Sequence, residues 1–98
     1  MRHVRFDVAT LAVEQVPVPI KAAYLLVAEQ DGLAQLQWEC LAYAFDPATI
    51  ARGRYRVDVT TLDGRVLHGP AVLMRSHEGA HVLRGDGPLE GVEADDLA

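Results

Sequence analysis

Cysteine is nearly missing from this 98-residue sequence: Cys40 is the only one, so no disulfide can form within the chain. A lone thiol is typical of proteins in a reducing compartment. Residues 1–7 contain no apolar stretch of the kind that secretion signals carry. No apolar run reaches the roughly 18 residues that a membrane-spanning helix needs. The sequence therefore predicts a cytoplasmic protein that does not partner with a membrane.

An excess of basic charge is also lacking. The chain has 9 Lys and Arg residues against 14 Asp and Glu residues, a formal net charge of −5. Five of the acids follow Gly85 and no Lys or Arg does, so 86–98 carries the whole net charge. Residues 1–85 are neutral and offer no basic footprint for a phosphate backbone, which argues against a nucleic-acid partner. We predict a single β domain over 1–85 and a flexible acidic tail over 86–98.

Catalytic and cofactor motifs are absent as well. Ser76 and His77 are adjacent, and neighbouring side chains of an extended chain point apart, so they cannot act as nucleophile and base. Cys40 falls on an apolar face, where burial raises the pKa of a thiol and makes it inert. Only His77, Glu78 and His81 could meet around a metal, on one mobile loop. We assign no catalytic, cofactor-binding or metal-binding residue.

Hairpin signals, in contrast, are strong. Asp63-Gly64 separates two β-rich runs and predicts a two-residue turn that places Val59 opposite His68. One face of this hairpin then points to the core and contains Tyr55, Val57, Val59, Val66 and His68. The other face carries a stripe whose guanidinium groups would suit the carboxylate or phosphate groups of an acidic partner: Arg52, Arg54 and Arg56.

The segment 20–45 allows two interpretations. Its alanines and the helical spacing of several apolar residues fit a pair of helices, whereas three polar residues at 35, 37 and 39 alternate with apolar ones as on a strand. Asp31-Gly32 lies between the two runs, so we favour a hairpin in which Leu25 opposes Trp38. The outer face of this hairpin turns apolar at its far end, and we expect the end to meet an identical subunit or another protein: Ile20, Leu41, Tyr43 and Phe45.

A short helix is predicted over 46–52. Asp46 would be its N-cap, Pro47 its first residue, and Gly53 would end it. About two turns of helix can close one end of a β-structure but cannot form a layer of their own.

The remaining chain predicts further strands. Gly69-Pro70 would form a bulge in a strand that ends at Met74, and a loop over 76–79 would lead to a last strand with His81 opposite Met74. Together these patterns predict an all-β fold: a small barrel or sandwich of about six strands in consecutive hairpins, with one short helix near 46–52.

Two functions are compatible with such a fold. We favour a non-catalytic protein–protein interaction or assembly module that self-associates, because the apolar end of the first hairpin needs a cover. The alternative is a small-ligand-binding or metal-dependent β-barrel enzyme that uses the barrel mouth near Tyr55, His68 and Arg54.

Overall fold

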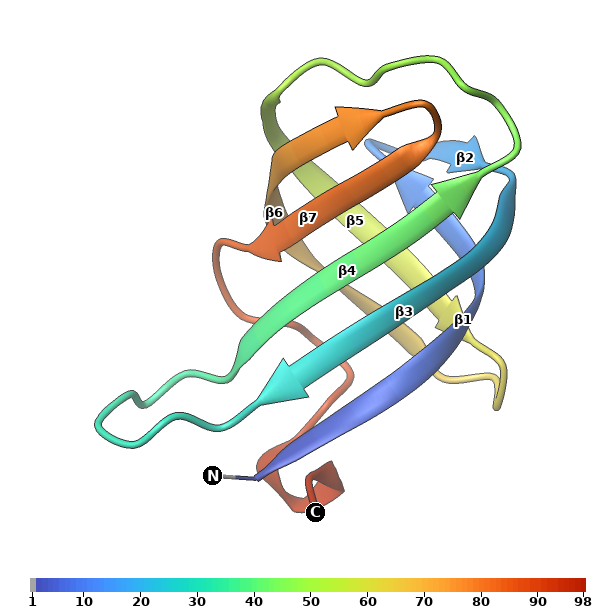
Figure 1. Ribbon diagram of the computed structural model, residues 1–98. Helices are drawn as coiled ribbons and strands as arrows, with labels where there is room; N and C mark the ends of the chain where they lie inside the picture. Colours follow the sequence, from blue (N-terminus) through green and yellow to red (C-terminus); the bar gives the residue numbers. More distant parts are fainter. Residues whose placement is uncertain (1) are drawn as a thin grey trace.

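The computed structural model describes residues 2–98 (Figure 1). The strands, in chain order, are β1 (His3–Val13), β2 (Val16–Val18), β3 (Ile20–Ala28), β4 (Gln37–Ala44), β5 (Gly53–Thr61), β6 (Val66–His77) and β7 (Ala80–Gly85). One turn of 3-10 helix, η1 (Ala94–Asp96), follows them near the C-terminus. Within this described part of the chain, no helix is long and apolar enough to cross a membrane.

Six of the strands close into an antiparallel barrel. Their hydrogen-bonded order is β1-β3-β4-β7-β6-β5, and β5 returns to β1. The strand β2 pairs only with the end of β1 and lies outside the closed ring. The prediction of an all-β fold is confirmed, and the closure makes it a barrel rather than a sandwich. The expected order of consecutive hairpins is wrong after β4, because β4 pairs with β7 and the chain crosses one barrel end to reach β5.

Closure depends on β1, which has a different partner along each half. From His3 to Asp7 it pairs with β3, and from Val8 to Val13 it pairs with β5. The register with β5 shifts between Val8 and Thr10. Such a bulge bends and twists a strand, and small barrels commonly use one where the sheet must curve.

The segment 20–45 forms the hairpin β3–β4, not a pair of helices. Leu25 lies opposite Cys40 and Val27 opposite Trp38, so each partner is two residues further along than predicted. The cause is the connection, because residues 29–36 form a loop that projects from the barrel (Figure 1) in place of a two-residue turn. A shift of two residues leaves every side chain on its face, since side chains alternate along a strand. Leu25, Val27, Trp38 and Cys40 accordingly all point inward and are buried.

The hairpin β5–β6 is shifted by one residue, and this reverses one of its faces. Leu67, not His68, lies opposite Val59. The turn is longer than predicted, because the backbone N–H of Thr61 donates to the carbonyl of Arg65 at 2.9 Å. A one-residue slip moves every side chain of a strand to the other face. Leu67 is therefore buried in the core, and His68 faces outward.

The strand β6 runs without interruption through Gly69-Pro70, where a bulge was predicted. Its register shift lies further on, between Leu73 and Arg75. Gly69 has another role: a Cβ there would come within 2.6 Å of the carbonyl oxygen of Pro88. Glycine at this position lets the C-terminal segment cross β6 at close range.

The turn between β6 and β7 is tighter than predicted. Glu78 and Gly79 have φ angles of 50° and 87°, a left-handed pair that makes a two-residue hairpin turn. This turn places Ser76, not Met74, opposite His81. His81 alternates with the half-buried Val82 along β7, so it points into the barrel end and is buried.

The helix predicted over 46–52 does not form. The side chain of Asp46 does accept the backbone N–H of Ala48 at 2.8 Å, as an N-cap would, but no helix follows. The next backbone groups bond to side chains of the barrel: Ile50 N–H donates to Ser76 Oγ, and the Ala51 carbonyl accepts the hydroxyl of Tyr55. A helix of two turns has little stability of its own, so these contacts prevail.

The C-terminal segment, residues 86–98, packs on the barrel, in contrast to the predicted flexible tail. Leu89, Val92 and Leu97 belong to the hydrophobic core. The backbones of His3 and Ala98 exchange two hydrogen bonds, which hold the chain end beside the first strand. The compact unit therefore extends beyond the predicted boundary at residue 85.

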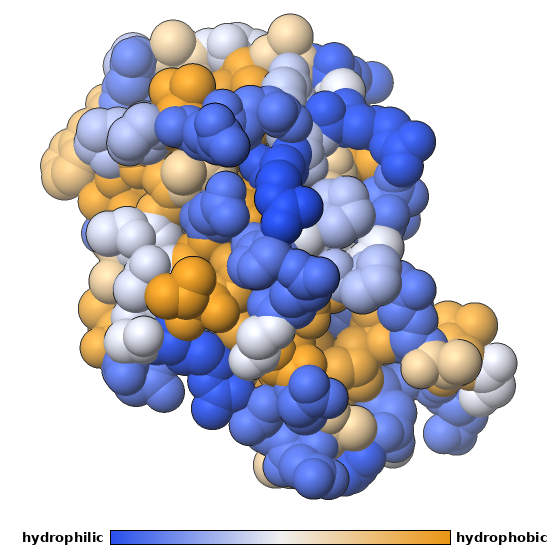
Figure 2. Space-filling model, turned by 180° about the vertical axis from the view of Figure 1, so that it is seen from behind, coloured by the Kyte–Doolittle hydropathy of each residue, from blue (hydrophilic) through white to orange (hydrophobic). Residues whose placement is uncertain are grey.

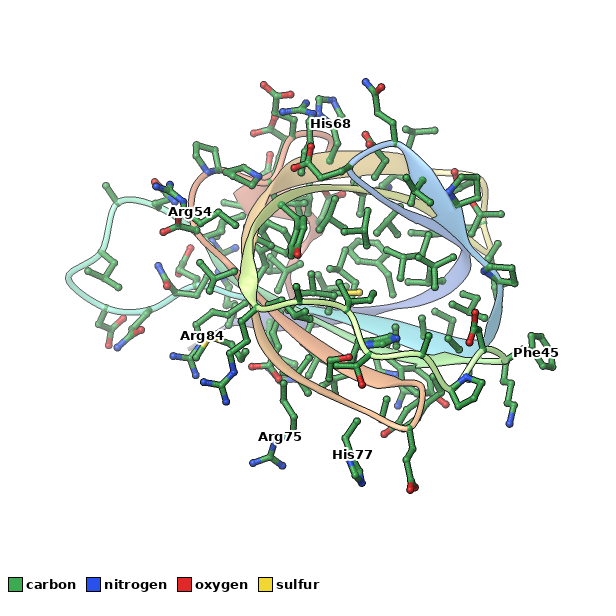
Figure 3. The ribbon with its side chains drawn as sticks, turned by 90° about the horizontal axis from the view of Figure 1, so that it is seen from above. Phe45, Arg54, His68, Arg75, His77 and Arg84 are labelled. Carbon is green, nitrogen blue, oxygen red and sulfur yellow. The ribbon has the colours of Figure 1, made fainter. Side chains whose placement is uncertain are left out.

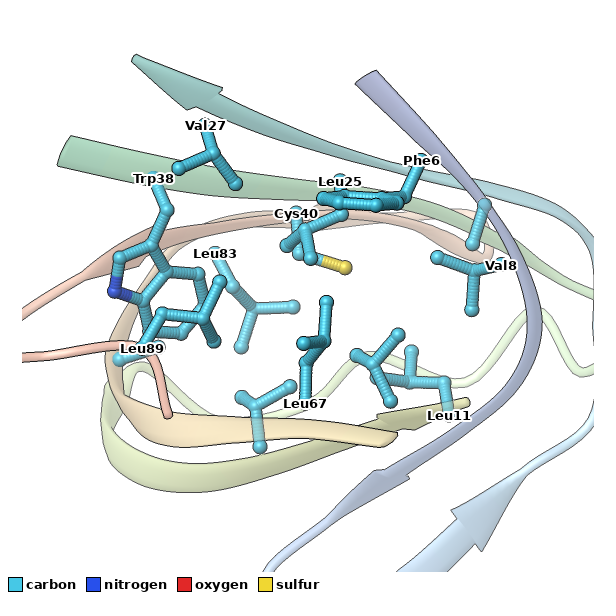
Figure 4. Close-up of a cluster of buried hydrophobic side chains, with 14 of the residues drawn as sticks. Phe6, Val8, Leu11, Leu25, Val27, Trp38, Cys40, Leu67, Leu83 and Leu89 are labelled. Atoms are coloured by element: carbon cyan, nitrogen blue, oxygen red, sulfur yellow. The ribbon is translucent and has the colours of Figure 1, made fainter. Parts of the chain in front are cut away.

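The core fills the barrel with side chains from every strand except β2. Leu25, Cys40, Leu67, Leu73 and Leu83 are at most 1% exposed (Figure 4). The tail covers one end of this core, where Leu89 lies beside the indole of Trp38. The Trp38 ring nitrogen donates to the carbonyl of Gly87 at 2.9 Å and so ties the tail to β4.

Candidate interaction surface

The outer face of β3, β4 and β7 is apolar, although these strands also supply the core. Register places Tyr24 of β3, Leu41 of β4 and Val82 of β7 side by side across the sheet. The next row of outward residues, Ala22, Tyr43 and Ala80, lies beside them. Strands that are apolar on both faces are usually covered on both. We call this surface, centred on Tyr24, Leu41, Tyr43 and Val82, the β3–β4–β7 face.

Within residues 2–98, no segment covers the β3–β4–β7 face. The tail instead lies along β6, where the backbones of His68 and Glu90 exchange hydrogen bonds. The side chain of Tyr43 is 47% exposed and that of Leu26, at the edge of the face, is 39% exposed. The opposite side of the molecule differs: Figure 2 shows hydrophilic side chains that run between separate hydrophobic patches.

The four residues predicted to form an interface fall into two groups. Tyr43 and Phe45 are exposed, and Phe45 points away from the barrel (Figure 3) with the Lys21 ammonium 5.8 Å from its ring. Leu41 is half-buried within the β3–β4–β7 face, and Ile20 is partly buried against the core. The sequence pattern missed Tyr24 and Val82. The alternation of Tyr24 with buried Leu25 is the signal that could have found the former.

Charged groups of both signs border the β3–β4–β7 face. Arg5 lies over the ring of Tyr24, 4.1 Å from its centroid. Glu39 and Arg84 are register partners on β4 and β7. Arg75 of β6 lies opposite Val82 and points outward, on the same side as Arg84 (Figure 3). Arginine at the rim of an apolar patch is characteristic of protein interfaces.

The predicted arginine stripe on β5 is engaged by the tail. Arg54 pairs with Asp86 although its side chain is 75% exposed. Arg56 lies 3.9 Å from the carboxylate of Glu90. Arg52 is exposed at the start of β5. The acids of the tail thus neutralise part of the stripe, and binding of an external anion there stays a prediction.

The histidines do not converge. His68 faces outward, where its ring contacts Arg56 and lies 3.0 Å from the carboxylate of Glu90. His81 is buried, whereas His77 is exposed on the other side of the turn. Among residues 2–98, no three His, Cys, Asp or Glu side chains come close enough together to hold a metal ion.

The barrel mouth proposed around Tyr55, His68 and Arg54 is not a single site. Tyr55 points into the barrel end, while Arg54 and His68 project from the outer face of the sheet (Figure 3). The one-residue shift of β6 is the reason for the position of His68.

Cys40 is fully buried, as predicted, and its burial raises the pKa of the thiol to about 12.

No protein-family model matches this chain, and comparison with curated proteins and with solved structures finds no significant similarity.

Proposed function

We propose that this protein is a non-catalytic interaction module that self-associates through the β3–β4–β7 face. The observation that carries the proposal is the row of Tyr24, Leu41 and Val82 on the outside of strands whose other face already fills the core. Strands that are apolar on both faces are usually covered on both, and a protein partner is the cover that we propose for this face.

A second copy of the chain is the partner that the charges favour. In a two-fold dimer the same patch meets itself, so a patch must carry both signs of charge to be self-complementary. Glu39 and Arg84 are neighbours across β4 and β7. A two-fold axis that runs parallel to the strands between β4 and β7 would bring each Glu39 toward Arg84 of the partner subunit.

The size of the face predicts weak association. Three strands about 4.8 Å apart, each contributing about five residues at about 3.3 Å per residue, give a patch on the order of 250 Å² in projection. A stable interface buries about 800 Å² per partner. The exposed ring of Phe45 and the bordering arginines must therefore contribute, and we expect a dimer that dissociates in the micromolar range or above.

Sedimentation velocity tests this proposal on the full chain, from about 5 µM to about 1 mM, where weak dimers dissociate. We expect the average mass to rise with concentration toward that of a dimer. Tyr43→Glu places a charge on the exposed centre of the face and should keep the protein monomeric throughout. Leu62→Glu is the matched control, since Leu62 is a 70% exposed apolar residue in the β5–β6 turn.

Two results would overturn self-association: a wild-type protein that stays monomeric at the highest concentration, or equal effects of Tyr43→Glu and Leu62→Glu. Far-ultraviolet circular dichroism and thermal melting of each variant show whether the barrel is intact. Both substituted side chains are exposed, so we expect the barrel to be intact in both variants.

A further inference from the structure

The barrel end that the 45–52 segment crosses contains a groove of about 350 Å³. Its apolar lining includes Val13, Val18, Ala44 and Ile50, together with Tyr55. The volume is in the range of small-molecule sites, which are concave and mostly apolar with a few placed polar groups. The groove lies apart from the β3–β4–β7 face and does not depend on the proposed function.

His81 supplies a polar group inside the groove. Its side chain is only 3% exposed, and it lines the groove from β7. Ser76 Oγ accepts the backbone N–H of Ile50 at 2.9 Å and lies 2.9 Å from His81 Nδ1. With Oγ occupied as an acceptor, the hydroxyl hydrogen can donate to Nδ1, and this leaves the ring hydrogen on Nε2.

The second ring nitrogen of His81 opens on the groove. No side-chain hydrogen bond of Nε2 is formed within residues 2–98. In that part of the chain, every fully enclosed side-chain nitrogen or oxygen atom has a hydrogen-bond partner. Nε2 is therefore not fully enclosed, and His81 is one of the residues that line the groove. A ring N–H that has no partner within the protein and is not fully enclosed can donate to a ligand.

Two carboxylates give the groove its charge. Glu14 and Asp46 are its charged lining residues. One oxygen of each is held by a backbone N–H, Glu14 by Arg56 at 2.7 Å and Asp46 by Ala48 at 2.8 Å. Both side chains are exposed to solvent at the edge of the groove. An anionic ligand would be repelled here, and a cationic one attracted.

We propose that the barrel-end groove binds a small apolar amine. The apolar part of the ligand would contact the lining residues Val13, Ile50 and Tyr55. The ammonium group would lie at one of the two carboxylates, Glu14 or Asp46. Nε2 of His81 would donate to an acceptor atom or a ring face of the ligand.

Tryptamine is a suitable probe, and indole-3-acetate has the same ring with a negative charge. We would titrate each into the ¹⁵N-labelled full chain and follow amide shifts by NMR. We expect tryptamine to cause saturable shifts at residues that line the groove, and indole-3-acetate to bind about tenfold more weakly or worse, because the charged side chains that line the groove, Glu14 and Asp46, are both negative. Absence of saturation, or equal affinity for the two probes, overturns the proposal.

Ala48→Trp and Thr49→Trp form a matched pair of variants. Both residues are exposed in the 45–52 segment, but only Ala48 lines the groove. Ala48→Trp should abolish the tryptamine shifts by filling the entrance, and Thr49→Trp should leave them unchanged. Asp46→Asn keeps the hydrogen bond to the Ala48 N–H and removes one charge, so it should weaken tryptamine binding several-fold and strengthen that of indole-3-acetate. Equal shifts in both tryptophan variants contradict binding in this groove.

Discussion

Ser76 Oγ lies 2.9 Å from Nδ1 of His81, and the same oxygen accepts the backbone N–H of Ile50. One serine thus connects the buried ring on β7 to the segment that crosses the barrel end. The imidazolium form of His81 is disfavoured there, because burial lowers the pKa of the ring below its ordinary value of 6.5. The barrel end is consequently sensitive to protonation.

Stability should fall as the pH is lowered below about 6.5, because the unfolded chain then binds a proton that folded His81 does not. The loss continues until the pH reaches the lower pKa of the folded state, so stability rises with pH across this window. We expect the melting temperature of the wild type to drop between about pH 7 and pH 5, and that of His81→Gln to change less. The pKa values of the Glu29, Asp63 and Asp96 carboxyl groups lie below their ordinary values of 4.5 for Glu and 3.8 for Asp. These groups therefore titrate below the pH window in which His81 does.

The other histidines are present in both proteins and serve as the internal control for this comparison. If the melting temperatures of the wild type and His81→Gln changed with pH in parallel, His81 would contribute nothing to the pH dependence of stability.

Gly64 should be required for the β5–β6 turn, because its φ of 89° is a conformation that alanine adopts only with strain. A Cβ there would meet nothing within 4 Å, so the cost of Gly64→Ala is purely conformational, about 1 to 2 kcal/mol. Gly53→Ala is the control, since its Cβ would have its nearest contact at an ordinary 3.7 Å. Urea unfolding measures both, and equal free energies of unfolding would contradict the left-handed turn.

Leu89 tests the packing of the C-terminal segment. Its side chain is 7% exposed beside Trp38, so Leu89→Ala should lower the free energy of unfolding by about 2 to 4 kcal/mol. Leu62→Ala removes a 70% exposed side chain and should change it by less than about 0.5 kcal/mol. Urea unfolding can be followed through the fluorescence of Trp38, the only tryptophan. If the tail were mobile, Leu89→Ala and Leu62→Ala would have equal free energies of unfolding.

Cys40 should react only from the unfolded state. Its pKa of about 12 and its complete burial leave neither thiolate nor access in the folded protein. We expect Ellman's reagent to modify Cys40 at a rate proportional to the unfolded population, so that Leu89→Ala accelerates the reaction about 30-fold or more, at 1.4 kcal/mol per tenfold. Rapid reaction of the wild type, or no acceleration in the variant, would contradict global opening as the route.

The strands can be predicted from the sequence, because the alternation of apolar and polar residues involves only neighbours in the chain. It identified the β3–β4 hairpin and the inward residues Leu25 and Cys40. These assignments are correct despite a wrong turn length at 29–36, since a shift of two residues does not change a face. The same reasoning failed for His68, where a longer turn shifted the register by a single residue.

Only the tertiary structure decided which strands close the barrel, where the tail lies, and which residues meet at the barrel end. Pairing of β1 with β5 and of β4 with β7 joins residues far apart in the chain, and no local pattern encodes such partners. The predicted helix at 46–52 does not form for the same reason. Ser76 and Tyr55 lie elsewhere in the sequence, and their hydroxyl groups form hydrogen bonds with backbone groups of this segment. By itself, then, the sequence determined which side chains need burial, and the packed barrel determined what they are buried against.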